Sequence, residues 1–341
     1  MKKTKLLALL LTLCTMFSLL AGCSSSSDNE EGSSISSTNN SENTEITPID
    51  INIGCMKGPT AIGMIKLLSD SDNGTSFNKY NYTIAGTADE ISTGLVKGEL
   101  DIAAVPCNLA SVLYNKTEGE IVTVAINTLG VLYIVETGDS IKTTDDLKGK
   151  TIYSTGQGTT PEYTLRFLLS SAGINPDNDV NIQYFSEASE VVATLSKNPD
   201  AVAMLPQPYV TSAMNNNENM RIALDVTKEW EKLCGDTVVT GVLVARKSFV
   251  EENKDAFKKF LEEYNLSTQY ANSNIDETAS LLEAFDVFKA AIAKKAIPYC
   301  NVTFISGAEM KDKVLAYLQV LYDQNPAAIG GKLEEGMFYI D

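Results

Sequence analysis

Apolar and polar positions follow a strand, loop and helix order that begins at residues 51–68. An apolar strand is formed by INIGCM, the polar KGPT interrupts it, and apolar residues return at helical spacing over 61–68. Thr60 is expected to be the N-cap of this helix, because its hydroxyl can accept a backbone N–H. Free N–H groups at such a helix start suit a small polar or anionic ligand; a plain strand-to-helix turn is the alternative.

The same pattern returns 100 residues later, at residues 151–169, where a strand, a Gly-containing loop and an apolar helix follow in the same order. At this offset identical residues include Gly58 and Gly158, Thr60 and Thr160, Leu68 and Leu168, Ala88 and Ala188, Glu90 and Glu190, and Pro106 and Pro206. The repeat predicts two α/β units of one design. Each presents a polar loop at a strand end, and the two units would face each other across a cleft.

Strands alternate with helices through most of the chain. Further strands are expected at 80–85, 100–105, 121–127, 131–136, 180–185, 201–205 and 220–225. Three helices are expected near the end of the chain, at 255–271, 278–291 and 309–322. This order predicts an α/β fold of mostly parallel sheets flanked by helices, in which a ligand binds beyond the carboxyl ends of the strands.

About 290 residues follow the N-terminal region, which suits two lobes better than one core. The apolar run at 238–245 is interrupted by Thr240 and Gly241, and we interpret it as a strand that crosses back to the first lobe. The outward crossing is expected at 131–136. The expected division is therefore a first lobe at 49–137, a second lobe at 138–240, and a return to the first lobe at 241–341.

The N-terminus has the features of an export signal. Three lysines precede an apolar run over residues 6–20 that is too short for a stable membrane span. The run ends in LAGC at 20–23, which closely resembles a bacterial lipobox. The resemblance implies a signal peptide at 1–22, cleavage before Cys23, and attachment of lipid such as palmitate to Cys23. Residues 23–48 are rich in Ser, Asn and Glu and are expected to be a disordered tether to the extracytoplasmic face of the membrane.

Charge and composition exclude several functions. The chain has 27 basic and 44 acidic residues, and cleavage before Cys23 removes three lysines, so the mature net charge is −20. Such an acidic protein is not expected to bind nucleic acid. The chain contains no histidine. This absence removes His-dependent nucleophilic catalysis, His-ligated zinc and the commonest general base, so we expect neither an enzyme nor a metal or cofactor.

Four cysteines remain beyond the lipobox, at 55, 107, 234 and 300, without a CxxC spacing. We favour free, partly buried thiols, although an exported protein could pair them. Trp230 is the single tryptophan, and we favour packing over stacking on a ligand.

The chain resembles the substrate-binding lipoproteins of ABC importers with the type II periplasmic-binding-protein fold, and within them the nitrate, taurine, alkanesulfonate and thiamine-precursor group. The resemblance is carried by LAGC at 20–23, GCMKGPTAIGM at 54–64, VKGELDIAAVPCNLA at 96–110, DLKGKTIYSTGQGTTPE at 146–162, LPQPYVTSA at 205–213, IPYCNVTFISG at 297–307 and NPAAIGGKL at 325–333. It implies two lobes joined by two crossing strands, and a monomer that presents its ligand to a membrane permease and its ATPase. A lipid-anchored sensor or adhesin on the same fold is the alternative.

The resemblance also implies a set of ligand-binding residues at the strand ends. They are Lys57, Gly58, Pro59, Thr60, Pro106, Cys107, Asn108, Gln157, Gly158, Thr159, Thr160 and Gln207. Gln207 stands where many relatives have an acidic residue, and Met56 and Lys57 stand where some have an aromatic one. Helix N-termini, threonine hydroxyls and Lys57 favour a sulfonate, carboxylate, phosphate or polar heterocycle, whereas Glu162 favours an amine. The compound itself is left open.

Overall fold

The computed structural model describes residues 46–198 and 201–340. The expected signal peptide, the lipobox and nearly all of the tether lie outside the described residues. Within the described ranges, no helix is long and apolar enough to cross a membrane.

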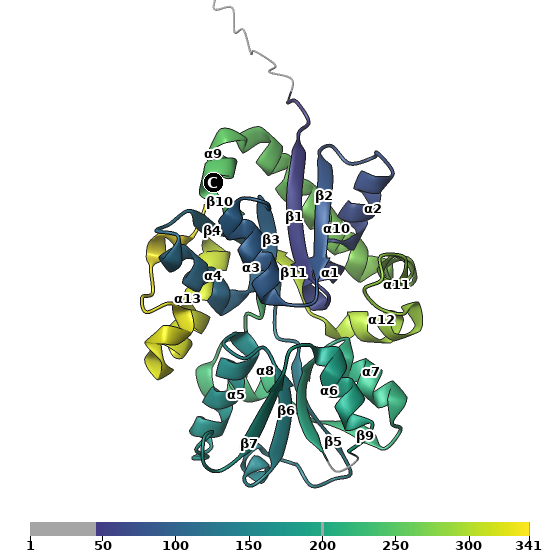
Figure 1. Ribbon diagram of the computed structural model, residues 1–341, viewed down its shortest axis with the longest axis vertical. Helices are drawn as coiled ribbons and strands as arrows, with labels where there is room; N and C mark the ends of the chain where they lie inside the picture. Colours follow the sequence, from purple (N-terminus) through teal and green to yellow (C-terminus); the bar gives the residue numbers. More distant parts are fainter. Residues whose placement is uncertain (1–45, 199–200, 341) are drawn as a thin grey trace, which may run out of the picture. The chain divides into compact units, whose positions relative to one another are not determined.

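Two sheets organise the described chain (Figure 1). The first has the strand order β11-β4-β10-β3-β1-β2, built from β1 (Asp50–Met56), β2 (Lys79–Ala85), β3 (Ile102–Pro106), β4 (Ile121–Thr128), β10 (Gly241–Arg246) and β11 (Val302–Ile305). The second has the order β7-β6-β8-β5-β9, built from β5 (Leu132–Thr137), β6 (Thr151–Thr155), β7 (Asn181–Phe185), β8 (Val202–Pro206) and β9 (Met220–Asp225).

The repeat seen in the sequence is present in the topology. In the first sheet β1 lies parallel between β2 and β3, and β10 lies antiparallel between β3 and β4. In the second sheet β6 lies parallel between β7 and β8, and β5 lies antiparallel between β8 and β9. Each sheet therefore has a reversed strand at the same place, β10 in the first and β5 in the second, and the first sheet has a further reversed strand, β11, at its edge. The predicted α/β fold with mostly parallel sheets is confirmed.

One strand lies in a different sheet from the one we expected. We assigned residues 131–136 to the first lobe, but β5 pairs with β8 and β9 of the second sheet. The chain thus leaves the first sheet at the end of β4 and returns to it at the start of β10. An apolar run predicts a buried strand but does not identify its partners, which explains the error. The division into two separately moving lobes stays a prediction.

Helices cover both faces of each sheet, because side chains alternate between the two faces of a strand and central strands such as β3 are buried along their whole length. Ile102 and Ala104 of β3 belong to one apolar cluster, whereas Ala103 and Val105 belong to another. The helices are α1 (Pro59–Ile62), α2 (Ile65–Asp72), α3 (Ala88–Lys97), α4 (Cys107–Lys116), α5 (Thr160–Ser171), α6 (Ala188–Leu195), α7 (Tyr209–Asn216), α8 (Val226–Cys234), α9 (Lys247–Glu252), α10 (Lys254–Ser273), α11 (Ile275–Ala284), α12 (Ala290–Ala296) and α13 (Gly307–Gln324). Short 3-10 turns lie at Thr144–Leu147, Ile297–Tyr299, Pro326–Ile329 and Glu335–Met337.

The helix expected over 61–68 is divided into α1 and α2 at Gly63 and Met64. Gly63 packs so closely that a Cβ there would lie 2.9 Å from Val302 Cγ1 and 3.1 Å from the Tyr264 hydroxyl. The absence of a side chain at Gly63 therefore lets α1 lie directly over α10 and β11.

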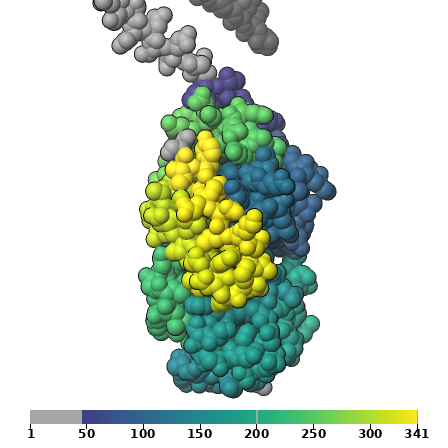
Figure 2. All heavy atoms as spheres, turned by 90° about the vertical axis from the view of Figure 1, so that its left-hand side faces the viewer, coloured from purple at the N-terminus to yellow at the C-terminus, as the bar shows by residue number. Residues whose placement is uncertain are grey.

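We call the part of the molecule built on the first sheet the first half and the part built on the second sheet the second half. Helix α13 belongs to the first half and packs against α5 of the second (Figure 2, yellow against teal). The hydroxyls of Thr164 in α5 and Tyr317 in α13 are 2.9 Å apart. Trp230 in α8 is buried beside both helices, with ring centroids 4.5 Å from Phe167 and 5.2 Å from Tyr317. This packing agrees with the structural role that we favoured for the tryptophan.

Candidate ligand-binding cleft

A cavity of about 400 Å³ lies where the carboxyl ends of strands from both sheets meet. Residues from both halves of the molecule form its walls. The lining residues are Met56, Lys57, Pro59, Thr60, Gly86, Thr87, Ala88, Asp89, Pro106, Leu132, Thr155, Gly156, Gln157, Thr159, Thr160, Pro161, Tyr184, Phe185, Ser186, Glu187, Ala188, Pro206, Tyr209 and Thr240.

Four helices of eight or more residues begin at this cavity. Helix α3 starts from the first sheet, and α5, α6 and α7 start from the second, so that their first residues, Ala88, Thr160, Ala188 and Tyr209, all line the wall. The first N–H groups of a helix have no partner within the helix, and the helix dipole places partial positive charge there. The cavity is therefore suited to an anionic or electron-rich group.

Seven of the twelve predicted site residues line the cavity, namely Lys57, Pro59, Thr60, Pro106, Gln157, Thr159 and Thr160. The other five are not lining residues: Gly58, Cys107, Gly158 and Gln207 are next to lining residues in the sequence, and Asn108 is two positions from the lining residue Pro106. Cys107 and Asn108 form the first turn of α4 and are fully buried. Whether the seven contact a ligand stays a prediction.

The prediction that Thr60 is an N-cap is wrong. Gly58 is the N-cap of α1, and the Thr60 hydroxyl donates to the Met56 carbonyl at 3.3 Å. In the second half the N-cap is Thr159, but its hydroxyl donates to the Gly156 carbonyl at 2.8 Å instead of accepting an N–H. Prolines at positions 59 and 161 occupy the first turns of these helices and remove one N–H from each.

Asn108 holds the second half from a position behind the wall. Its Nδ2 donates to the carbonyl of Gly158 at 3.2 Å and to that of Ala328 at 2.9 Å. Its Oδ1 accepts a hydrogen bond from the Thr160 hydroxyl at 3.3 Å. Asn108, in the first turn of α4, therefore positions two residues of the second half, Gly158 and Thr160.

Gln207 has a local role in this structure. It is 2% exposed, and its Oε1 accepts from the Thr211 backbone N–H at 3.2 Å and from the Thr211 hydroxyl at 2.8 Å. The side-chain amide thus supports the first turn of α7.

Three charged residues line the cavity, namely Lys57, Asp89 and Glu187; Lys57 forms an ion pair, and the Glu187 carboxylate accepts a backbone hydrogen bond at the start of α6. Lys57 Nζ lies 3.1 Å from Asp286 Oδ2. Glu162, which favoured an amine ligand in the sequence, accepts from the Gly158 N–H at 2.6 Å and from Arg166 Nε at 2.9 Å, and it is not a lining residue. Glu187 lines the cavity, and a Cβ on Gly86 of the first half would lie 2.6 Å from its Oε1. Gly86 is thus what lets Glu187 come so close.

Two lining hydroxyls that sequence reasoning missed have no hydrogen-bond partner among the described residues. They are the Tyr184 hydroxyl and Thr240 Oγ1, both buried atoms. Burial raises the pKa of Tyr184, so its hydroxyl stays protonated and can donate. The repeat contained a signal for this wall, because Ala88 and Ala188 are identical at the offset of 100 residues and both line the cavity.

The four cysteines are unpaired within the described chain. Cys55, Cys107 and Cys300 are buried, and Cys234 is half-buried. Burial raises the pKa of Cys55 to about 12, which leaves an unreactive thiol. Three of the four thus act as small apolar residues.

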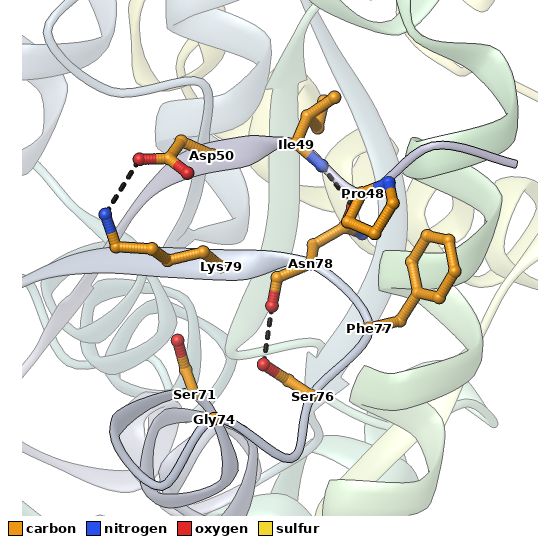
Figure 3. A pocket seen from close by; sticks show the side chains of 9 residues that line it. All are labelled: Pro48, Ile49, Asp50, Ser71, Gly74, Ser76, Phe77, Asn78 and Lys79. Atoms are coloured by element: carbon orange, nitrogen blue, oxygen red, sulfur yellow. Dashed lines mark hydrogen bonds and ion pairs between the residues drawn. The ribbon is translucent and has the colours of Figure 1, made fainter.

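A second hollow of about 200 Å³ lies near the start of β1 and β2 (Figure 3). Its polar groups bond to one another. Lys79 pairs with Asp50 at 2.9 Å, and the Ser76 hydroxyl donates to the Asn78 carbonyl. This hollow belongs to the opposite strand ends and has no helix N-terminus of the kind found in the cleft.

The sequence and the fold of this chain resemble those of known proteins. The sequence profile described as NMT1/THI5 like matches residues 111–278. An ABC transporter structure from Parabacteroides distasonis is 26% identical, with a TM-score of 0.70 over 85% of this chain and 98% of that chain. The chain has the type II periplasmic-binding-protein fold. No match was found among curated proteins.

Two further structures have the same fold at lower identity. The periplasmic aliphatic sulphonate binding protein SsuA from Escherichia coli is 17% identical, with a TM-score of 0.68 over 86% of this chain and 92% of that chain. The periplasmic nitrate-binding protein NrtA from Synechocystis PCC 6803 is 15% identical, with a TM-score of 0.64 over 86% of this chain and 84% of that chain. The resemblance to ABC substrate-binding proteins is confirmed. The descriptions of these solved structures name a transporter and binding proteins, and the expectation that this chain is not an enzyme rests on its missing histidines.

Proposed function

We propose that this protein is the extracytoplasmic solute-binding component of an ABC importer, and that it captures a small polar ligand, anionic or heterocyclic, between its two sheets. One observation carries the proposal: α3, α5 and α6, which come from both sheets, all begin at a single cavity of about 400 Å³. A cavity of this size suits a small organic molecule.

The walls indicate what such a ligand contains. Helix N-termini and the free hydroxyls of Tyr184 and Thr240 offer donors to a sulfonate, carboxylate, phosphate or ring acceptor. Met56, Leu132 and Phe185 add apolar area for the rest of the molecule. Solved structures of similar fold are described as bound to MOPS or as binding nitrate, which fits a ligand with an anionic group.

Lipidation of Cys23 would hold the protein at the outer face of the cell membrane. The acidic tether would then let the folded part reach a permease and its ATPase while it acts as a monomer. The lipobox sequence at 20–23 supports this part of the proposal.

Native mass spectrometry of the purified protein tests the proposal, because a tightly bound solute often survives purification. We expect one small molecule per chain, a one-to-one calorimetric titration with that compound, and a smaller radius of gyration in small-angle scattering when it is bound. The proposal fails if no molecule is carried and if taurine, alkanesulfonates, nitrate and aminopyrimidines all leave the melting temperature unchanged.

Uptake of the labelled compound separates import from sensing. Cells that lack this protein should lose uptake, and the wild-type protein should restore it. Unchanged uptake, with binding confirmed, would favour the lipid-anchored sensor.

A further inference from the structure

The turn between α11 and α12 contacts four different parts of the molecule with four consecutive residues. The Phe285 ring packs on Tyr82 of β2 at 5.6 Å between centroids, and Val287 is buried in the core of the first half. Asp286 pairs with Lys57 at the cleft wall. The Phe288 ring meets Tyr209 of α7, from the second half, edge-on at 5.0 Å. Figure 1 shows α12, which follows this turn, beside α7.

The backbone of this turn is fixed independently of the cleft. Val287 N–H donates to the Leu282 carbonyl at 2.8 Å, and Asp286 N–H donates to the Glu283 carbonyl at 3.1 Å. These two bonds form a Schellman motif at the end of α11. Asp286 has φ 53°, a left-handed conformation that favours glycine. What the aspartate adds over a glycine is its carboxylate, and that carboxylate holds Lys57.

The backbone of Lys57 also accepts a hydrogen bond from Tyr209. The Lys57 N–H donates to the Ala85 carbonyl at 2.8 Å, and its own carbonyl accepts from the Tyr209 hydroxyl at 3.3 Å. Tyr209 therefore contacts the first half twice, through its hydroxyl on Lys57 and through its ring on Phe288. Tyr209 lines the cavity, whereas Phe288 does not.

We propose that Tyr209, through its contacts with Phe288 and with the Lys57 carbonyl, forms a clasp that determines how long the closed cleft retains its ligand. The proposal rests on the proposed function, since it concerns release of a ligand held between the sheets. Phe288 acts as a positioning residue, because it reaches the ligand only through Tyr209. Opening of the cleft would separate Tyr209 from both of its contacts, so the clasp stabilises the closed state alone.

Two variants of the same turn test the clasp. Phe288→Leu removes the aromatic contact across the cleft, and Phe285→Leu removes a similar contact within the first half. An aromatic pair is worth roughly a 2- to 12-fold change in an equilibrium constant. In stopped-flow release of the co-purified ligand, we expect Phe288→Leu to release about fivefold faster than wild type. Phe285→Leu should release at the wild-type rate although its melting temperature falls.

A third variant measures the contribution of the Tyr209 hydroxyl alone. Tyr209→Phe keeps the ring on Phe288 and loses the bond to the Lys57 carbonyl, so release should again be faster, and this variant remains informative if Phe288→Leu does not fold. Equal release rates for Phe288→Leu and Phe285→Leu would overturn the clasp, as would a wild-type rate for both Phe288→Leu and Tyr209→Phe.

Scattering of the ligand-free variants separates failure of the clasp from failure of the proposed function. If the protein binds no solute, the proposed function fails, but Phe288→Leu should still have a larger radius of gyration than Phe285→Leu. Equal radii would overturn the clasp on their own.

Discussion

The Thr160 hydroxyl at the start of α5 donates a hydrogen bond to Asn108 Oδ1 at the start of α4, 3.3 Å away, and so joins the second half to the first. Its sequence twin Thr60 bonds only to the Met56 carbonyl within its own half. The two threonines are equivalent in sequence but not in their partners. Only Thr160 should influence closure.

Thr160→Val should therefore weaken ligand binding by about 0.5–1.5 kcal/mol, the worth of one neutral hydrogen bond. This corresponds to a rise in Kd of roughly 2- to 12-fold. Calorimetric titration with the co-purified ligand measures the change. Thr194→Val is the control, because the Thr194 hydroxyl donates to the Glu190 carbonyl at 2.9 Å within its own half and Thr194 does not line the cavity, so this variant should bind within twofold of wild type. The interpretation is wrong if the two variants bind equally well.

The periodicity of apolar residues and the internal repeat predicted the topology, because the periodicity depends on which positions are buried and the repeat depends on the order of the elements along the chain. The offset of 100 residues placed α1 with α5 and β3 with β8, and these elements are equivalent in the two sheets. The pattern could not assign β5 to its sheet, since an apolar strand looks alike in either one.

The sequence also could not predict which hydrogen-bond partners the side chains of the predicted site residues have. Thr60, Thr159 and Gln207 all have side chains that can cap a helix or bind a ligand, and nothing in their spacing decides which. The partners that decide it, such as the Thr211 hydroxyl for Gln207, depend on side-chain directions in the folded protein.

Lipidation can be tested on the full chain. Because Leu20-Ala21-Gly22 precedes Cys23, wild-type protein should incorporate labelled fatty acid and partition into detergent. Cys23→Ala should lose the label and remain as an uncleaved or wrongly cleaved precursor, visible as a shift in mass. Cys14→Ala is the control and should be processed like wild type. Absence of label from the wild-type protein would rule out the anchor.

Replacement of Asp286 tests the cost of its left-handed backbone. Asp286 and Glu118 have the same φ of 53° after helix ends, but only Asp286 has an ion-pair partner there. Glu118→Gly should raise the free energy of unfolding by about 0.5–1 kcal/mol, because the relief of about 1–2 kcal/mol of left-handed strain exceeds the cost, about 0.4–1 kcal/mol, of the extra freedom of glycine in the unfolded chain. Asp286→Gly should raise the free energy of unfolding by a smaller amount, because loss of the ion pair with Lys57 offsets up to about 1 kcal/mol of the increase. Urea unfolding measures both.

Salt gives an internal check on that comparison. A surface ion pair is screened by salt, so the gap between Asp286→Gly and Glu118→Gly should narrow in 1 M NaCl. A gap that is unaffected by salt would mean that the Lys57 pair is not its cause.

Glu136 should make stability depend on pH. This residue of β5 is 2% exposed, and it accepts hydrogen bonds from the Ile141 N–H at 3.0 Å and from the Ser140 hydroxyl at 2.7 Å. It also pairs with Arg221. Burial opposes ionisation, but these donors and the guanidinium outweigh it and hold the pKa of Glu136 below its ordinary value.

The sign follows from proton binding. A glutamate with a lowered pKa binds protons more weakly in the folded than in the unfolded state, so its contribution is complete at neutral pH. It is lost as the pH falls from the ordinary glutamate pKa toward the lowered one. Glu136→Gln should thus melt well below wild type at pH 7, and the difference should shrink between pH 5 and pH 3. Glu252→Gln, an exposed control, should follow wild type throughout. A difference that stays constant with pH would show that packing, and not the charge of Glu136, causes the loss.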